Sequence, residues 1–284
     1  MAISSALGTE CTIELPAGTL AYRECGAGPP VVFVHGLLVN GDLWRAVVPP
    51  VADAGYRCVT PDWPLGSHRY PLRAGADLSP PGLARLVADF LVALDLADAT
   101  LVANDTGGAI TQLVMTRHPE RVGRVVLTSC DCFESFFPRP FNLLPAAARL
   151  PGFGWLLAQG LRSRRVQRLP IGYGLVSHAP IEPAIMESYL APSRRDAGIR
   201  RDLTRFLRGV HRRYTLDAAQ RLPDFDRPVL LAWAADDRLF PVANATRLAG
   251  LLPDARVELI ERSRTFVPED QPARLVELVV KFLG

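Results

Sequence analysis

The sequence predicts an α/β protein with a mostly parallel central sheet, helices on both faces and an inserted helical cap. Short runs of apolar, often β-branched residues recur along the chain, as in strands that are buried on both faces. Helical patterns separate most of these runs, and such alternation is typical of an open parallel sheet. The alternation stops near Phe133 and resumes near Pro228, which marks the insertion.

The individual elements follow from these patterns in chain order. Two short strands joined by a Pro-Ala-Gly turn predict an N-terminal hairpin at 11–15 and 20–24. The apolar runs predict buried strands at 31–34, 57–60, 100–103, 125–128, 229–232 and 257–260. The helical patterns predict core helices at 43–52, 80–94, 109–118, 241–251 and 271–282.

The interrupting segment differs from the rest in composition. We expect residues 1–134 and 217–284 to form the core and residues 135–216 to form the cap. The cap segment holds 14 arginines against four acidic residues, a net charge of +10, whereas the whole chain carries +3, which leaves −7 for the core. We expect the cap arginines to pair with the acidic core; the alternative is that they attract an anionic substrate or carrier.

Composition excludes several classes of protein. The chain is 49% apolar and has no apolar run of the ~20 residues that a membrane helix needs, so we expect no membrane association. The five cysteines lack metal-type spacing and the first residues lack a signal-peptide pattern, which predicts reduced thiols and a cytoplasmic protein without a metal or cofactor. Aromatic residues do not interleave the basic ones, so we expect a small-molecule substrate and not a nucleic acid. The sequence leaves the oligomeric state open.

The carboxyl ends of parallel strands carry functional residues in open α/β sheets. The strand at 31–34 is followed by His35-Gly36-Leu37, whose Leu37 N–H can stabilise an oxyanion; an ordinary turn held by His35 is the alternative. The strand at 100–103 leads to Asp105, whose spacing to Gly107 predicts a strand–nucleophile–helix elbow with the Thr106 N–H beside the same site. Asp105 as a plain helix cap is the alternative there.

Two further strand ends carry carboxylates. Asp237 follows the strand at 229–232 and has the offset of an acid that orients a catalytic base; a solvated acidic turn is the alternative. Asp131 follows the strand at 125–128 and is a further candidate for a substitute base or a pocket residue.

These strand ends, in this order, resemble the α/β-hydrolase fold superfamily, and the cap lies where that superfamily inserts its lid. Aspartate at the elbow narrows the resemblance to haloalkane dehalogenases, fluoroacetate dehalogenases and epoxide hydrolases. The resemblance implies that Asp105 attacks a carbon atom, that a histidine-activated water hydrolyses the resulting ester, and that Asp237 orients the histidine.

The sequence departs from this pattern where the histidine belongs. Thr265 stands at that position, and a threonine hydroxyl cannot take a proton from water near pH 7. The halide-binding tryptophan and asparagine of dehalogenases are replaced by Thr106 and Leu37, and Leu38 replaces a proline of epoxide hydrolases. His68 is the candidate substitute base, and an ordinary loop histidine is the alternative. The candidate acids in the cap are Tyr173, Tyr189 and Tyr214.

Three functions remain open from the sequence. The favoured one is hydrolysis of a small hydrophobic carbon electrophile, most plausibly an epoxide, through Asp105 with a substitute base. The second is a rearrangement, elimination or cyclisation in which Asp105 is a general acid or base in a dry pocket. The third is a binding protein that has kept the fold without the chemistry.

Overall fold

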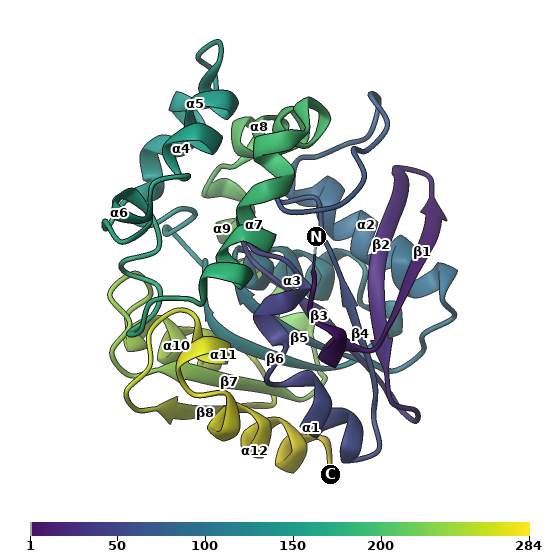
Figure 1. Cartoon of the computed structure of the whole chain (residues 1–284). Helices are drawn as coiled ribbons and strands as arrows, with labels where there is room; N and C mark the ends of the chain where they lie inside the picture. The colour runs from purple at the N-terminus through teal and green to yellow at the C-terminus, as the bar shows by residue number, and fades with distance from the viewer. Residues whose placement is uncertain (1) are drawn as a thin grey trace.

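The computed structural model describes residues 2–284 and contains one eight-stranded sheet in the order β1-β2-β4-β3-β5-β6-β7-β8 (Figure 1). The strands are β1 (Thr9–Leu15), β2 (Gly18–Cys25), β3 (Pro30–Val34), β4 (Arg57–Pro61), β5 (Ala99–Asp105), β6 (Val122–Cys130), β7 (Val229–Ala234) and β8 (Ala255–Ile260). The pairs β1/β2 and β2/β4 are antiparallel and all the others are parallel. The predicted α/β class and its mostly parallel sheet are confirmed.

Helices pack against the sheet in two groups. Helix α1 (Val48–Asp53) contacts α12 (Pro272–Leu283), whereas α3 (Thr106–Arg117) contacts both α2 (Pro80–Ala93) and α9 (Arg213–Arg221) (Figure 1). The core helices are α1 (Val48–Asp53), α2 (Pro80–Ala93), α3 (Thr106–Arg117), α10 (Val242–Ala249), α11 (Val267–Asp270) and α12 (Pro272–Leu283). Within residues 2–284, no helix combines the length and hydropathy required to cross a bilayer.

One predicted helix is wrong in extent. The segment 43–52 is divided into the short 3₁₀ helix η2 (Gly41–Trp44) and α1, which begins at Val48. Pro49 and Pro50 cause the break, because proline lacks an N–H group and its ring clashes with the carbonyl four residues earlier in a continuous helix. Both prolines are tolerated in the first turn of α1.

The segment between β6 and β7 is helical. It contains α4 (Leu144–Ala147), α5 (Phe153–Gly160), α6 (Arg164–Gln167), α7 (Pro183–Arg195), α8 (Ala197–Gly209) and α9 (Arg213–Arg221). Figure 1 shows α4 and α5 standing away from the sheet at the top of the molecule. The expected boundary between 216 and 217 falls within α9, which packs on α3. We keep residues 135–216 as the proposed extent of the cap, with α9 joining it to the core.

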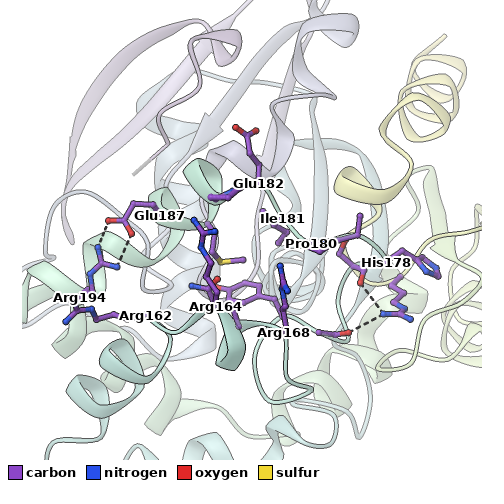
Figure 2. A pocket seen from close by; sticks show the side chains of 17 residues that line it. Arg162, Arg164, Arg168, His178, Pro180, Ile181, Glu182, Glu187 and Arg194 are labelled. Atoms are coloured by element: carbon purple, nitrogen blue, oxygen red, sulfur yellow. Dashed lines mark hydrogen bonds and ion pairs between the residues drawn. The ribbon is translucent and has the colours of Figure 1, made fainter.

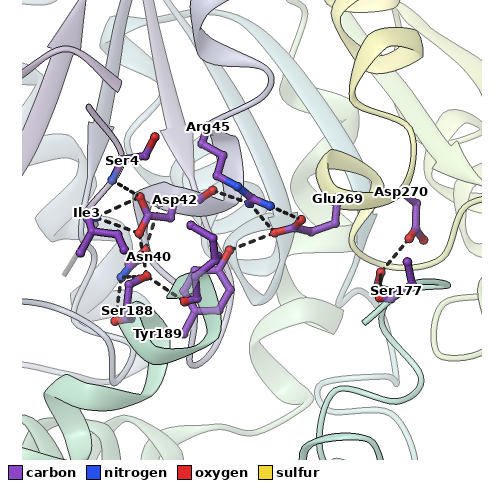
Figure 3. A network of polar contacts seen from close by, with 12 residues as sticks. Ile3, Ser4, Asn40, Asp42, Arg45, Ser177, Ser188, Tyr189, Glu269 and Asp270 are labelled. Carbon is purple, nitrogen blue, oxygen red and sulfur yellow. Dashed lines mark hydrogen bonds and ion pairs between the residues drawn. The ribbon is translucent and has the colours of Figure 1, made fainter. Parts of the chain in front are cut away.

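A polar network holds α7 against the core (Figure 3). Arg45 forms a two-pronged ion pair with Glu269, at 2.6 and 2.7 Å, and the Tyr189 hydroxyl donates to the same carboxylate at 3.2 Å. The Ser188 hydroxyl donates to Asp42 at 2.6 Å. Because Ser188 and Tyr189 belong to α7, these bonds fix one side of the cap over the sheet.

The expected pairing of cap arginines with core carboxylates is wrong. Among residues 2–284, the ion pairs of cap arginines join Arg194 and Arg195 to Glu187 and Arg201 to Asp202, and both acids lie in the cap itself. These partners are close along α7 and α8, so local pairs form without a core carboxylate. Among the described residues, the other arginines of the cap form no ion pair with a core carboxylate.

Candidate active site

Asp105 lies on a tight turn where β5 ends and α3 begins. Its backbone has φ 54° and ψ −130°, a conformation that residues other than glycine rarely adopt. Two glycines make room for the turn: a Cβ on Gly107 would lie 2.2 Å from the carbonyl oxygen of Val34, and one on Gly108 would lie 2.3 Å from Cβ of Cys130. The Asp105 side chain makes no capping hydrogen bond to α3. The local geometry is that of an elbow, not of a capped helix, and the reacting role of Asp105 stays a prediction.

The turn after β3 faces the Asp105 carboxylate. The Leu37 N–H donates to Asp105 Oδ2 at 3.2 Å. A Cβ on Gly36 would lie 2.1 Å from that oxygen, so only glycine allows this approach. His35 holds the turn: its Nε2 accepts from the Trp63 N–H at 2.8 Å, which leaves Nδ1 to donate to the Gly36 carbonyl at 2.9 Å. Burial lowers the pKa of His35 to about 3, so this ring is neutral and structural.

Burial changes the protonation of Asp105. Its pKa rises to about 6, mainly because the carboxyl group is removed from water, and the negative charge of Asp237 raises it further. The backbone N–H groups of Thr106 and Leu37 act in the opposite direction, because they favour the ionised form. A carboxyl group with a pKa near the working pH exchanges protons readily in both directions.

Asp237 binds a hydroxyl group, not an imidazole. Its Oδ1 accepts from the backbone N–H groups of Leu239 and Phe240, at 2.7 and 2.9 Å, and from the Thr265 hydroxyl at 3.1 Å. Its Oδ2 is buried and has no hydrogen-bond partner among the described residues. Burial raises the pKa of Asp237. The Asp237 carboxyl group is thus buried and fixed by hydrogen bonds through one oxygen, and it does not lie in a solvated turn.

Asp131 lies behind the elbow. It is fully buried, and its Oδ2 accepts from the Thr106 hydroxyl at 3.0 Å. Burial, together with the charge of Asp105, raises its pKa well above the usual value. Asp131 is not one of the residues that line the cavity over Asp105. Asp131 therefore stabilises the elbow through its hydrogen bond with Thr106, and a direct contact between Asp131 and the substrate stays a prediction.

A small apolar cavity lies over Asp105. Its volume is about 80 Å³, and its polar wall residues are Asp105, Thr106 and Tyr173. The apolar wall comes from core and cap alike, as the residues Leu37, Leu38, Phe137, Pro138, Phe141, Leu144, Leu157, Leu161, Ile171, Gly172, Val176, Leu239, Phe240 and Phe266 show. No histidine lines this cavity, although all five of the chain lie within the described residues.

The structure separates the three candidate tyrosines. Tyr173 lines the cavity with Asp105, and its hydroxyl donates to the Leu38 carbonyl at 2.7 Å. Burial and the Asp105 charge raise its pKa, which keeps the hydroxyl protonated. Tyr189 donates instead to Glu269, and Tyr214 accepts from Arg213. Only Tyr173 of the three is placed to act on a group at Asp105.

The structure does not bring His68 to Asp105. Its ring is buried, its Nε2 lies 3.4 Å from Asp202 Oδ2 on α8, and it lines a separate surface pocket near Ser188. Burial lowers its pKa. Asp202 of the cap binds the His68 ring away from Asp105, so in this arrangement His68 does not contact a water at Asp105.

Asn104 is a site residue that the strand-end patterns do not reveal. This fully buried amide donates to the Thr265 carbonyl at 2.6 Å and to the Thr128 hydroxyl at 2.7 Å. It therefore fixes the loop that carries Thr265 against the elbow. A polar residue next to Asp105 in an otherwise apolar strand is the signal that could have identified it.

No metal centre accompanies these residues. Nowhere in residues 2–284 do three or more His, Cys, Asp or Glu side chains gather as a metal site would require.

Comparison with known proteins places this geometry in a family. The family described as alpha/beta hydrolase fold matches residues 29–170, which is half of the chain and includes β3 and the elbow. The chain belongs to the alpha/beta hydrolase fold family.

Two curated relatives within this family cover nearly all of the chain. Haloalkane dehalogenase 2 of Mycobacterium bovis is 27% identical over 94% of this chain and 92% of its own length. A cis-3-alkyl-4-alkyloxetan-2-one decarboxylase of Shewanella oneidensis is 27% identical over 93% of this chain and 85% of its own. The crystal structure of the haloalkane dehalogenase DatA from Agrobacterium tumefaciens C58 superimposes with a TM-score of 0.79 and 23% identity, covering 99% of both chains. The protein is a hydrolase-fold enzyme with haloalkane dehalogenase-like relatives.

Proposed function

We propose that this enzyme acts on a small hydrophobic substrate through Asp105 without activating water, by a rearrangement, elimination or cyclisation. The observation that carries the proposal is the composition of the cavity. Asp105 faces apolar walls and the Tyr173 hydroxyl, with no imidazole, and Asp237 holds the hydroxyl of Thr265. Once Asp105 has attacked a substrate it can no longer act as a base, and no histidine lines the cavity to take the proton of an attacking water.

Two further features support an acid–base role for Asp105. Its pKa of about 6 suits proton transfer near neutral pH. Apolar walls exclude water and strengthen the interaction of the carboxylate with a developing charge. A non-hydrolytic reaction also occurs on this fold in the decarboxylase-named relative from Shewanella oneidensis.

Epoxide hydrolysis is the second candidate, and Tyr173 favours it. In this reaction, an Asp105 oxygen attacks a ring carbon, the carbon–oxygen bond breaks, and the Tyr173 hydroxyl donates its proton to the released oxygen. The Leu37 N–H at Asp105 Oδ2 then stabilises the oxyanion when water attacks the ester carbonyl. Release of the ester lacks a histidine base, so the Tyr173 phenolate that ring opening leaves behind has to take the proton of the attacking water.

A product analysis in water labelled with heavy oxygen separates the candidates. The protein is incubated with a panel of apolar epoxides and oxetanones, and products are identified by mass spectrometry, with Asp105→Asn as the inactive control. The proposed reaction gives products without label and without a lasting mass increase of the protein. Labelled diols support hydrolysis, and an unreleased ester on Asp105 supports attack without turnover. Turnover that survives in Asp105→Asn contradicts both, and the binding-protein alternative predicts thermal shifts with ligands but no product.

A further inference from the structure

A second cavity in the cap is larger than the one over Asp105 and strongly basic. Its volume is about 520 Å³, within the range of small-molecule pockets. Five arginines and two glutamates line it, so the fixed charge of its walls is positive. These residues come from the link between α5 and α6, from α6 and α7, from the segment between α6 and α7, and from the loop that carries Thr265: Arg162, Arg164, Arg168, Arg194, Arg264, Glu182 and Glu187 (Figure 2).

Part of this positive charge has no counterpart in the protein. Arg194 is neutralised by Glu187, as the dashed lines in Figure 2 show. Arg164 and Arg168 are exposed and lie near the centre of the view, and their guanidinium groups have no hydrogen bond or ion pair with any described residue. Arg264 donates to two backbone carbonyls, but its Nε is buried without a partner. Guanidinium groups in this state are available to an external oxyanion.

The basic cavity adjoins the cavity over Asp105. Tyr173 lines both, so its ring forms part of the wall between them. Arg264 of the basic cavity directly precedes Thr265, which binds Asp237. One molecule can therefore place a charged group in the basic cavity and a reacting group in the cavity over Asp105.

The cavity over Asp105 is much the smaller of the two, at about 80 Å³ against about 520 Å³ for the basic cavity. The basic cavity therefore has room for the part of a substrate that lies outside the cavity over Asp105.

We propose that the basic cavity binds the oxyanion group of an amphiphilic substrate, a carboxylate or a phosphate monoester, whose apolar part extends to Asp105. Arg164 and Arg168 recognise the anion at the entrance, and Arg264 contributes at the inner side. This inference rests on the proposed function, because it assumes that Asp105 reacts with the apolar end of the molecule.

Binding measurements without turnover test the inference. Octanoate, octyl phosphate and 1-octanol are titrated by calorimetry into the wild-type chain, the double variant Arg164→Gln/Arg168→Gln and Arg165→Gln. Arg165 is the matched control, because it is an exposed arginine of α6 that does not line the cavity. We expect at least one anion to bind roughly tenfold more tightly than the alcohol at low salt. The double variant should lose this preference, added salt should weaken it, and Arg165→Gln should keep it.

The arms of the experiment identify the ligand and separate the two proposals. Preference for octanoate assigns a carboxylate, and preference for octyl phosphate assigns a phosphate. Equal affinity for the alcohol, binding of neither anion, or a preference that survives in the double variant overturns the inference. Asp105→Asn should bind the anion as the wild type does. If turnover proves independent of Asp105 while the anion preference holds, the proposed function fails and the anion site remains.

Discussion

Replacing Asp105 with asparagine should stabilise the protein at neutral pH. Asparagine has the same shape and can still accept the Leu37 N–H, but it carries no charge into the buried site. The pKa of Asp105 rises from an ordinary 3.8 to about 6 on folding. At about 1.4 kcal/mol for each tenfold change in proton affinity, ionised Asp105 costs the folded state about 3 kcal/mol. In a chain of this size, that corresponds to a rise in Tm of roughly 6 °C.

The pH dependence of this gain follows from the direction of the shift. Between about pH 4 and pH 6, the unfolded chain has lost the Asp105 proton while the folded chain retains it, so the stability of the wild type falls as pH rises. The advantage of Asp105→Asn should be near zero at about pH 4, about half of its full value at pH 5 and complete above about pH 7. The substitution also removes the Asp105 charge, which together with burial raises the pKa of Asp131.

Thermal unfolding of the two proteins from pH 4.5 to pH 8 measures this difference. Asp226→Asn is the matched control, because Asp226 is exposed, and it should leave the Tm difference flat across the range. A destabilised Asp105→Asn protein, or a gain that does not change with pH, would refute the claim that burial penalises the Asp105 charge.

Three further substitutions test other parts of the site. Thr265→His should place an imidazole beside the free oxygen of Asp237 and introduce hydrolysis, detected as label from heavy-oxygen water; a folded variant that incorporates none contradicts the role assigned to this position. Gly36→Ala should lower turnover about 100-fold with little loss of secondary structure, because its Cβ displaces the reacting carboxylate; turnover near that of the wild type would show that this carboxylate tolerates displacement. Glu269→Gln should reduce the free energy of unfolding in urea by about 3 kcal/mol, because it leaves the partly buried Arg45 without its charge partner; unchanged unfolding would mean that the network of Figure 3 does not hold the cap.

The sequence predicts well which residues lie at the strand ends, because parallel pairing brings the carboxyl ends of the strands to the same side of the sheet. Apolar runs identify the strands, and parallel pairing then puts Leu37, Asp105 and Asp237 at one edge of the sheet. The hydrogen bond from Leu37 to Asp105 and that from Thr265 to Asp237 are consequences of this topology. Residues that are distant in sequence thus meet without any local signal, because β3, β5 and β7 lie close together in the sheet.

The cap is less predictable because its contacts are long-range side-chain pairs. His68 follows a strand end as a base would, yet Asp202, which lies 134 positions away, captures it. Tyr173, Tyr189 and Tyr214 are equivalent in sequence terms, and only the path of the loop before α7 brings Tyr173 to the cavity. No periodicity or spacing encodes such pairings, since they depend on how separate helices are placed over the sheet.

The energetic cost of the site argues against a protein that only binds. Asp105, Asp131 and Asp237 are all removed from water, the pKa of each is raised, and Asp131 and Asp237 each keep one oxygen without a partner. Asparagine could accept the same backbone hydrogen bonds without placing three acids in a low-dielectric region. A raised pKa serves no purpose in holding an apolar ligand, whereas it is what a proton-transferring carboxyl group requires. Strain at the Asp105 backbone adds to that cost. These unfavourable terms meet at one point, in a cavity whose other walls are mostly apolar, and they support the proposal that Asp105 reacts with the substrate.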